Sequence, residues 1–409
     1  MTRPTPAVHD RVLSLPSTDL PAYVYDLDAL GAHAAAVRDA LPERVELYYA
    51  AKANPEPEIL TALRPYVDGF EVSSGGELAH VAKAVAGHPL AFGGPGKTPE
   101  EITAALERGV ERFHVESEHE LRVLAESARR VAPARRVAVL PRVNLPVADG
   151  SLAGSSLAMG GRPTPFGMDP AQAAPVIRQL AGGTFPHLEL LGVHAHLASG
   201  LQAAEQIAVA ESVVSWATGL GVRLGEVNVG GGMHVDYGDP GRRFDWAAYG
   251  AGLARITERH PRLTLRIEPG RALTAYCGWY ATEVLDVKLS HGEEFAVVRG
   301  GTHHLRTPAT KGHDQPFSVL PVDAWPHSWP RPAAQGVAGV APDRERGRIT
   351  LAGQLCTPKD VLARRVPAGG LRAGDRVVFA LAGAYAWNIS HHDFLMHPKP
   401  GFHFLRSTA

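Results

Sequence analysis

Residues 45–94, "VELYYAAKANPEPEILTALRPYVDGFEVSSGGELAHVAKAVAGHPLAFGG", contain the pattern that decides the fold. Three short apolar runs, 45–52, 69–74 and 90–94, each end in polar residues or glycine. Helical apolar spacing, with capping residues or prolines at its start, fills the stretches between them. Strands that alternate with helices in this way predict a parallel sheet, because parallel strands need a crossover connection.

The same unit recurs as far as about residue 277. Eight strand–helix units favour a closed (β/α)8 TIM barrel, which we expect to span residues 32–277. The main alternative, a doubly wound open sheet, would have fewer units and a Gly-rich turn after its first strand, and this sequence lacks that turn. Five further runs complete the set: 112–117, 137–144, 190–199, 226–231 and 263–270.

The pattern of apolar and polar residues changes after about residue 278. Runs such as "EEFAVVRGG" and "DRVVFALAGAY" alternate apolar and polar residues, and turns rich in Gly, Pro and Asp separate them. This pattern predicts an antiparallel β domain over 278–409, which residues 1–31 are expected to join. The Gly/Ser-rich segment 145–167 follows the fifth strand and is expected to form a mobile loop over the site.

Composition narrows the class of protein. A net charge of −1 over 409 residues argues against a general binder of nucleic acid or anionic membranes. The presence of only two cysteines argues against a disulfide framework and favours the reducing cytoplasm. No signal peptide and no run of about 18 apolar residues is present, so no membrane association is expected.

A barrel carries its chemistry at the carboxyl ends of its strands. Lys52 ends the first run, and a buried lysine with a lowered pKa could form a Schiff base with an aldehyde. The alternative is a lysine that pairs with Glu71 or Glu268. The other polar residues and glycines at strand ends are Ser73, Glu116, Arg142, His194, His196, Gly230, Gly231, Gly232 and Glu268.

Two segments near the last strands could hold an anion. The glycines of "VNVGGG" (227–232) allow backbone N–H groups to approach a phosphate, although a tight strand-to-helix turn is the simpler explanation. In "IEPGRALTAY" (267–276), Arg271 and Gly270 could bind the same phosphate. Glu268 could hold a ring nitrogen in its protonated form, unless it forms only a surface pair with Arg271.

The pair His194 and His196 allows two interpretations. An HxH pair on one strand face could bind zinc, but no third ligand follows at the expected spacing, and we expect no metal. Otherwise one histidine stacks on a planar ring while Ser199 binds a phosphate. Cys356 is either a small buried hydrophobic residue or an acid tuned by a neighbour. An aldehyde, an aromatic nitrogen and a phosphate together describe pyridoxal 5'-phosphate.

The motifs "YYAAKANPEP", "GFEVSSGGEL", "HAHLASG", "VNVGGG", "EPGR", "LCTPKD" and "LAGAY" resemble, in this order, those of fold type III pyridoxal-phosphate decarboxylases. This group includes the ornithine, diaminopimelate and arginine decarboxylases. The resemblance implies a catalytic Schiff-base lysine at Lys52, His196 stacked on the cofactor and Cys356 as the proton donor. It also implies a homodimer with shared sites and these further cofactor-binding residues: Arg142, Ser199, Gly230, Gly231, Gly232, Glu268, Gly270, Arg271 and Tyr385.

Departures from the family pattern bear on the substrate. The acidic residue that usually follows the catalytic cysteine and receives a distal ammonium group is Thr357 here. Pro165 and Ala198 replace a usual lysine and glycine. The His- and Arg-rich segments 299–317 and 386–401 resemble the siderophore-biosynthesis branch, which acts on substrates such as citryl-diaminopropionate. A cationic pocket would suit a polycarboxylate tail, and the expected substrate-binding residues are His303, His304, Arg306 and Thr357.

Three other functions stay open at this point. The first is decarboxylation of a free diamino acid of the diaminopimelate or ornithine type. The second is amino-acid racemisation, which needs a base on each face of Cα and no loss of CO₂. The third is a non-enzymatic regulator or carrier that binds the cofactor. Such proteins are small single barrels, and the second domain with Cys356 and Tyr385 argues against this function.

Overall fold

A computed structural model describes residues 3–146, 160–306, 308, 312–334 and 347–407. The chain folds into two compact units. We call 31–235 with 244–273 the barrel unit, and 1–30 with 236–243 and 274–409 the β unit. No helix in the described part of the chain combines the length and apolar character needed to span a membrane.

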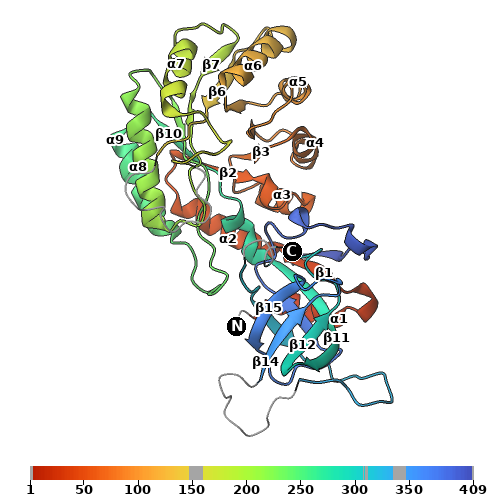
Figure 1. Ribbon diagram of the computed structural model, residues 1–409. Helices are drawn as coiled ribbons and strands as arrows, with labels where there is room; N and C mark the ends of the chain where they lie inside the picture. The colour runs from red at the N-terminus through yellow and green to blue at the C-terminus, as the bar shows by residue number, and fades with distance from the viewer. Residues whose placement is uncertain (1–2, 147–159, 307, 309–311, 335–346, 408–409) are drawn as a thin grey trace. The chain divides into compact units, whose positions relative to one another are not determined.

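The barrel unit is built on one parallel sheet (Figure 1). Its hydrogen-bonded order is β7-β6-β5-β4-β3-β2-β10-β9-β8. The nine strands are β2 (Val45–Ala50), β3 (Gly69–Val72), β4 (Leu90–Phe92), β5 (Arg112–Val115), β6 (Val137–Pro141), β7 (Leu188–Leu190), β8 (Gly192–His194), β9 (Glu226–Asn228) and β10 (Thr264–Ile267).

The strands β7 and β8 are two halves of one strand, interrupted at Leu191. The Leu191 N–H donates to Val139 of β6 at 3.1 Å, while its carbonyl accepts from Gly225 beside β9 at 2.8 Å. A parallel bridge between Arg142 and His194 joins the two ends of the strand order. Counted in this way, eight strands close into a barrel, and the predicted (β/α)8 fold is confirmed.

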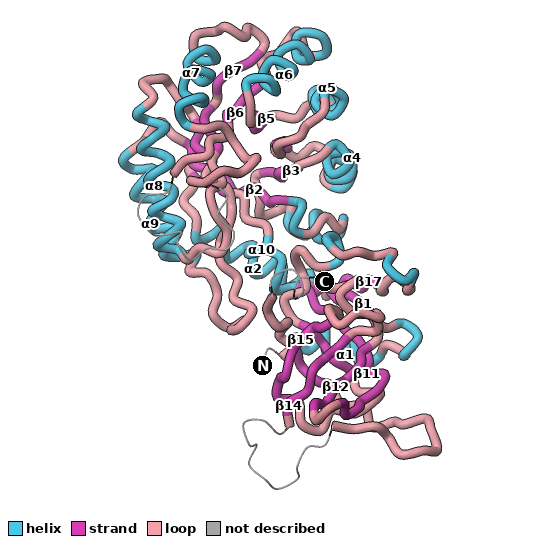
Figure 2. The backbone as a smooth tube through the Cα atoms, in the orientation of Figure 1, coloured by secondary structure: helices cyan, strands magenta, loops and turns pink. Residues whose placement is uncertain are grey.

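Helices follow the strands and lie outside them, as Figure 2 shows for α4 to α9. Polar caps define several helix starts: the side chains of Ser74, Thr98, Ser117 and Asp245 accept the N–H groups of their own first turns. The helices are α2 (Leu27–Ala40), α3 (Pro57–Leu63), α4 (Gly75–Ala84), α5 (Pro99–Glu107), α6 (Glu118–Val131), α7 (Pro170–Ala181), α8 (Ala203–Gly219), α9 (Trp246–Arg259) and α10 (Arg271–Thr274).

Polar side chains form layers inside the barrel. Arg266 of β10 is fully buried and binds Glu46 of β2 (Nε–Oε2 3.0 Å) and Glu226 of β9 (Nη2–Oε2 3.1 Å). Glu226 also pairs with Arg112 of β5 at 3.0 Å. Side chains two residues apart on a strand share a face. The next interior layer toward the carboxyl ends of β5, β9 and β10 therefore contains His114, Asn228 and Glu268.

The β unit contains one mixed sheet in the order β13-β16-β11-β12-β14-β15, and β1 pairs with both β11 and β17. The pairings are antiparallel, as expected, except for β12–β14 and β1–β17. The unit begins with helix α1 (Pro6–Ser14). Its strands are β1 (Ala22–Asp26), β11 (Gly278–Ser290), β12 (Glu293–Val298), β13 (Phe317–Leu320), β14 (Arg348–Ala352), β15 (Val361–Pro367), β16 (Arg376–Phe379) and β17 (Gly401–Leu405).

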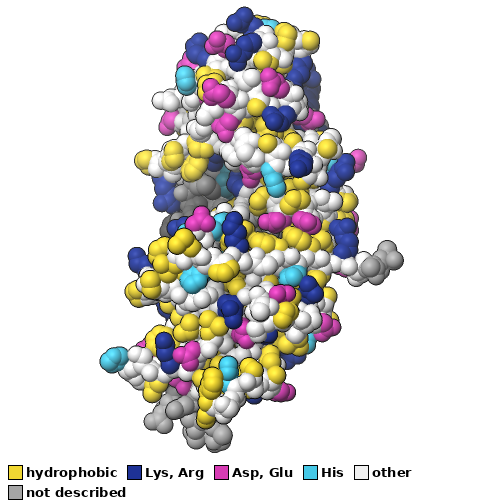
Figure 3. Space-filling model, turned by 90° about the vertical axis from the view of Figure 1, so that its right-hand side faces the viewer, with side chains coloured by type: hydrophobic (Ala, Val, Ile, Leu, Met, Phe, Trp, Pro, Cys, Tyr) yellow, Lys and Arg dark blue, Asp and Glu magenta, His cyan; other side chains and the backbone are white. Residues whose placement is uncertain are grey.

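On the face drawn in Figure 3, acidic and basic side chains are interspersed, and neither sign gathers into one large patch. This distribution agrees with the net charge of −1. The protein therefore presents no broad cationic surface on that face.

Candidate active site

Lys52 follows the first barrel strand but is not part of it. The strand β2 ends at Ala50, and Lys52 lies in the 3-10 turn Ala51–Ala53 with 48% of its side chain exposed. Its Nζ atom lies 2.9 Å from Oε2 of Glu71 and 3.5 Å from Oγ of Ser73. The lysine is therefore less buried than expected and pairs with Glu71, and its role as a Schiff-base lysine stays a prediction.

A second acid, which sequence reasoning missed, lies beside this pair. The Glu77 carboxylate accepts the Ser73 N–H at 2.6 Å, and Ser73 Oγ donates to Oε1 of Glu71 at 2.8 Å. Burial, together with repulsion from Glu71, raises the pKa of Glu77 to about 7. Two carboxyl groups and an ammonium group therefore share one end of the barrel, and Glu77 titrates near neutral pH.

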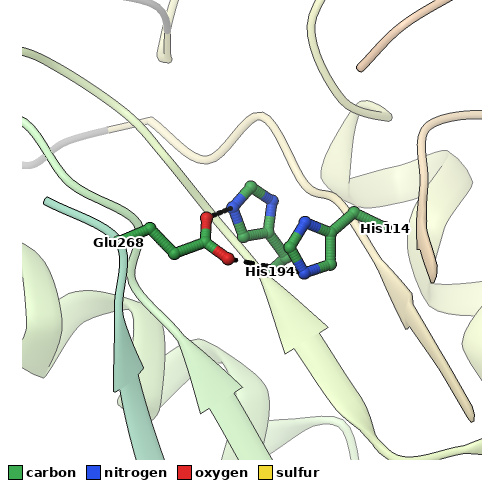
Figure 4. A group of neighbouring side chains, drawn as sticks. All are labelled: His114, His194 and Glu268. Carbon is green, nitrogen blue, oxygen red and sulfur yellow. Dashed lines mark ion pairs between the residues drawn. The ribbon is translucent and has the colours of Figure 1, made fainter. Parts of the chain in front are cut away.

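Glu268 lies at the carboxyl end of β10, in a ring of neutral polar groups (Figure 4). Its Oε1 accepts from Nδ2 of Asn228 at 2.7 Å, and its Oε2 lies 3.3 Å from Nε2 of His194. His114 stacks on His194 with ring centroids 4.2 Å apart and 6° between the ring planes. Burial lowers the pKa of both histidines well below the usual value, so both imidazoles are neutral at pH 7.

His114, His194 and Glu268 are the one group in the described part of the chain whose potential metal-ligand atoms all lie within 4.8 Å of one another. Zinc binds a histidine nitrogen near the plane of its ring. The two rings are stacked almost parallel, so no single point lies in both ring planes. The geometry therefore fits hydrogen-bonding support of Glu268 and does not fit a metal chelate.

His196 faces the glycine loop 230–232 rather than the stacked rings of His114 and His194. Its Nδ1 accepts the N–H of Gly231 at 3.1 Å. Burial, followed by the charges of Arg142 and Lys52, lowers the pKa of His196 well below its usual value. The two histidines of the HxH pair thus have separate surroundings, which argues against their joint binding of one zinc ion.

The loops after β8, β9 and β10 touch through glycines. A Cβ atom on Gly231 would lie 2.3 Å from the Glu268 carbonyl, and one on Gly232 would lie 2.1 Å from the Ala198 carbonyl. Gly232 also has φ +97°, which L residues rarely adopt. The N–H of Gly200 donates to the Gly232 carbonyl at 2.7 Å. Only glycine allows this close backbone approach. The N–H groups of Gly230 and Gly231 donate to Oδ1 of Asn228 and Nδ1 of His196.

These residues fit pyridoxal phosphate. Glu268 offers a carboxylate for the pyridine nitrogen, Lys52 offers an amine for the aldehyde, and the glycine loop resembles an anion cradle. The loop contacts bring together His196, Ser199, Gly230, Gly231, Gly232 and Glu268 within the barrel unit. Gly270 and Arg271 follow Glu268 directly, with Gly270 buried and Arg271 half-buried at the start of α10.

Arg142 was expected to contact the cofactor, and its described contacts are with other protein groups. Its Nη1 lies 2.8 Å from Oε1 of Glu116, and its guanidinium lies over the Phe166 ring. The N–H of Gly167 donates to Oε2 of Glu116 at 2.8 Å. Glu116 therefore anchors one flank of the predicted loop 145–167, of which residues 147–159 lie outside the described part.

Cys356 is exposed in the loop between β14 and β15 of the β unit. The buried carboxylate of Asp360 accepts the N–H groups of Thr302 at 2.6 Å and Leu355 at 2.8 Å. Asp360 thereby ties the loop that carries Cys356 and Thr357 to the segment that carries His303. Thr357 is half-buried, and Tyr385, in the same unit, is half-buried with φ +49°.

The two histidines after Thr302 are not cations. Burial, reinforced by neighbouring histidines, lowers the pKa of His303 to about 4 and that of His304 to about 3. His304 is further fixed by the Tyr280 hydroxyl, 3.1 Å from its Nδ1. These two histidines therefore add no charge at neutral pH to the cationic, hydrogen-bonding pocket expected from segments 299–317 and 386–401. Arg306 is exposed.

Comparison with known proteins points to one family. The family model described as "Pyridoxal-dependent decarboxylase, pyridoxal binding domain" matches residues 27–275. A 2-[(L-alanin-3-ylcarbamoyl)methyl]-2-hydroxybutanedioate decarboxylase of Staphylococcus aureus is 38% identical over 393 residues, covering 94% of each chain. An L-glutamyl-[BtrI acyl-carrier protein] decarboxylase of Niallia circulans is 31% identical, covering 93% of this chain and 88% of that one.

Solved structures share the fold. A diaminopimelate decarboxylase variant from Helicobacter pylori, complexed with L-lysine, has a TM-score of 0.82 at 23% identity. The match covers 98% of this chain and 94% of that chain.

Proposed function

Because the chain belongs to the family of pyridoxal-dependent decarboxylases, it is a pyridoxal-phosphate enzyme that removes CO₂ from an amino acid, and we propose that its substrate is a citrate-conjugated diaminopropionate. The observation that carries this proposal is the 38% identity, over 94% of each chain, to a decarboxylase of that chemical class. Its name describes alanine joined at C3, through an amide, to a hydroxy-tricarboxylate skeleton. Such a reaction would belong to siderophore biosynthesis.

Residues of the β unit favour a substrate that has no distal ammonium group. Thr357 occupies the position where an acid would receive that ammonium. The nearby carboxylate of Asp360 already accepts backbone N–H groups and the Thr302 hydroxyl at 2.8 Å. Arg306 offers a positive charge to a carboxylate. These groups suit a polycarboxylate tail better than an amine.

The barrel residues would hold the cofactor by the roles that their positions allow. Lys52 would bind its aldehyde, and Glu268 would face its ring nitrogen. His196 would stack on the ring, with Ser199, Gly230, Gly231, Gly232, Gly270 and Arg271 around the phosphate and Arg142 nearby. When bound, pyridoxal phosphate accepts the electron pair left behind by the departing CO₂.

Cys356 would then deliver a proton to Cα, so that the carboxylate of the substrate is replaced by hydrogen. Within the proposal the enzyme is a cytoplasmic homodimer in which Cys356 of one subunit serves the barrel of the other. Mixing Lys52→Ala with Cys356→Ala protein tests this arrangement, because only shared sites allow a mixed dimer to regain activity. If subunits exchange, as labelled chains would show, and no activity returns, the shared-site arrangement is wrong.

A decarboxylation screen by mass spectrometry tests the substrate. Purified holoenzyme is given citryl-diaminopropionate, ornithine, arginine, lysine and diaminopimelate in separate reactions, with CO₂ release measured in parallel. We expect loss of CO₂ from the citryl conjugate and little from the free diamino acids. Robust activity on a free diamino acid alone would overturn the proposal, and inversion at Cα without CO₂ release would indicate a racemase.

A further inference from the structure

The orientation of the Asn228 side chain is set by its neighbours. Its Oδ1 accepts the backbone N–H of Gly230 at 2.9 Å, which directs Nδ2 to Oε1 of Glu268 at 2.7 Å and to Nε2 of His114 at 3.4 Å. An amide nitrogen only donates hydrogen bonds. Oε1 of Glu268 and Nε2 of His114 are therefore both acceptors, and neutral His114 carries its proton on Nδ1.

His194 faces the other carboxylate oxygen. It is buried, and neither of its nitrogens makes a hydrogen bond within the described part of the chain. Its Nε2 lies 3.3 Å from Oε2 of Glu268, and the stacked His114 ring holds it in place. In the tautomer with hydrogen on Nε2, His194 has a donor that is free to bind Oε2 after a small rotation of either side chain.

We propose that Asn228 and His194 are positioning residues that orient the Glu268 carboxylate by means of neutral N–H donors, while the stacked His114 ring fixes His194. No lysine or arginine pairs with Glu268 among the described residues, and the imidazole nitrogens that lie 3.7 Å (His114) and 3.3 Å (His194) from its oxygens belong to neutral rings. The cations that act on the two histidines from neighbouring elements are Lys52, Lys97, Arg142 and Arg266.

Neutral support has a chemical consequence. A carboxylate held by a lysine or arginine shares its charge with that cation, whereas one held by amide and imidazole N–H groups keeps its full charge for a new partner. In the family site that partner is the protonated pyridine nitrogen, so Asn228 and His194 would help to keep that nitrogen protonated. This inference rests on the cofactor lying with its ring nitrogen toward Glu268.

Two substitutions of His194 distinguish the loss of its N–H donor from the loss of its ring packing. His194→Phe keeps a flat ring against His114 but removes the nitrogen, and His194→Gln loses the ring but restores an N–H near the position of Nε2. Solid-state ¹⁵N NMR of holoenzyme loaded with ¹⁵N-pyridine-labelled cofactor reports the protonation of the ring nitrogen directly. His88→Phe, which removes a histidine bonded to the Val67 carbonyl, serves as the matched control.

We expect the ring nitrogen of His194→Phe to lose its proton about one to two pH units lower than in the parent, from the strength of a hydrogen bond to a charged group. His194→Gln and His88→Phe should stay near the parent. Equal ring-nitrogen titration in parent and His194→Phe would overturn the proposal, as would an equal fall in both His194 variants. Should His194→Phe not fold, Asn228→Leu provides the same comparison, with Asn228→Gln as its rescue variant.

Discussion

Nζ of Lys52 lies 2.9 Å from Oε2 of Glu71, and Glu71 in turn receives the Ser73 hydroxyl at 2.8 Å. The lysine is half-exposed, whereas Glu71 is buried. The pair holds the amine at the mouth of the barrel in the absence of an aldehyde. Ser73 lies beside this pair, and it donates its hydroxyl to Glu71 and its backbone N–H to Glu77.

Glu77 should make the protein less stable as the pH rises. Its pKa is about 7 in the folded protein against 4.5 as the reference, so the folded state holds the proton more tightly. The stabilising contribution is complete below about pH 4.5 and is lost as the pH rises through 7, by about 2 kcal/mol. Glu77→Gln should flatten this part of the profile, measured by urea unfolding from pH 4.5 to 8. The exposed control Glu126→Gln should leave it unchanged, and equal profiles for all three proteins would contradict the assignment.

His303 should act in the opposite direction. Its pKa is lowered to about 4 from 6.5, so the unfolded chain takes up the proton first. Its contribution is present above pH 6.5 and is lost as the pH falls toward 4, by about 2 kcal/mol. His303→Asn should reduce the acid sensitivity of the β unit in the same unfolding series, with exposed His291 as the site of the control substitution. A His303 resonance that titrates near pH 6.5 in NMR spectra would show that the side chain is not buried as described.

The two cysteines should differ in reactivity. Cys356 is exposed, whereas Cys277 is buried, and burial raises the pKa of the Cys277 thiol. Iodoacetamide should therefore label Cys356 in the native protein and both cysteines only after denaturation, as peptide mass spectrometry would show. Cys356→Ala should lower kcat by roughly 100-fold or more, the usual size of a general-acid effect, while cofactor absorbance is kept. Parent-like kcat in that variant would exclude the proton-donor role.

Arg266 should contribute to the stability of the folded barrel. It is fully buried between Glu46 and Glu226, and its guanidinium lies over the ring of Tyr48. Arg266→Met removes the buried cation between Glu46 and Glu226 and leaves only Arg112 to pair with them, and it should cost about 3–5 kcal/mol in the free energy of unfolding. Guanidinium unfolding measures this, with the exposed pair residue Arg259→Met as a control expected to cost less than about 1 kcal/mol. A loss of less than about 1 kcal/mol in Arg266→Met would contradict the network.

The barrel could be predicted because its strand pattern is local. Most of the runs from 45 to 270 place a short strand before a helix, and such units close into a barrel with few alternatives. The interruption at Leu191 could not be predicted, because it depends on the backbone hydrogen bonds that Leu191 makes with residues on two neighbouring strands of the sheet. In the β unit, the parallel pairings of β12 with β14 and of β1 with β17 join segments far apart in sequence, which local patterns do not specify.

Part of the site was predictable in the same way. Lys52, His196 and Glu268 stand out as polar groups after apolar runs. His114 and Asn228 were missed because each is a single polar residue inside a strand, although their spacing of two residues from Arg112 and Glu226 marks them as facing the interior. The neutral state of His303 and His304 follows from burial, which composition alone does not reveal.

Chemical trapping of the cofactor tests the central claim, that Lys52 at the barrel mouth holds pyridoxal phosphate. Holoenzyme is reduced with borohydride, digested, and mapped by mass spectrometry for the pyridoxyl group. We predict a single modified peptide that carries the group on Lys52, and no modification in Lys52→Ala, while Lys97 in the neighbouring loop stays unmodified. A stable pyridoxyl group on any other lysine, or full retention of the cofactor absorbance by Lys52→Ala, would contradict the account.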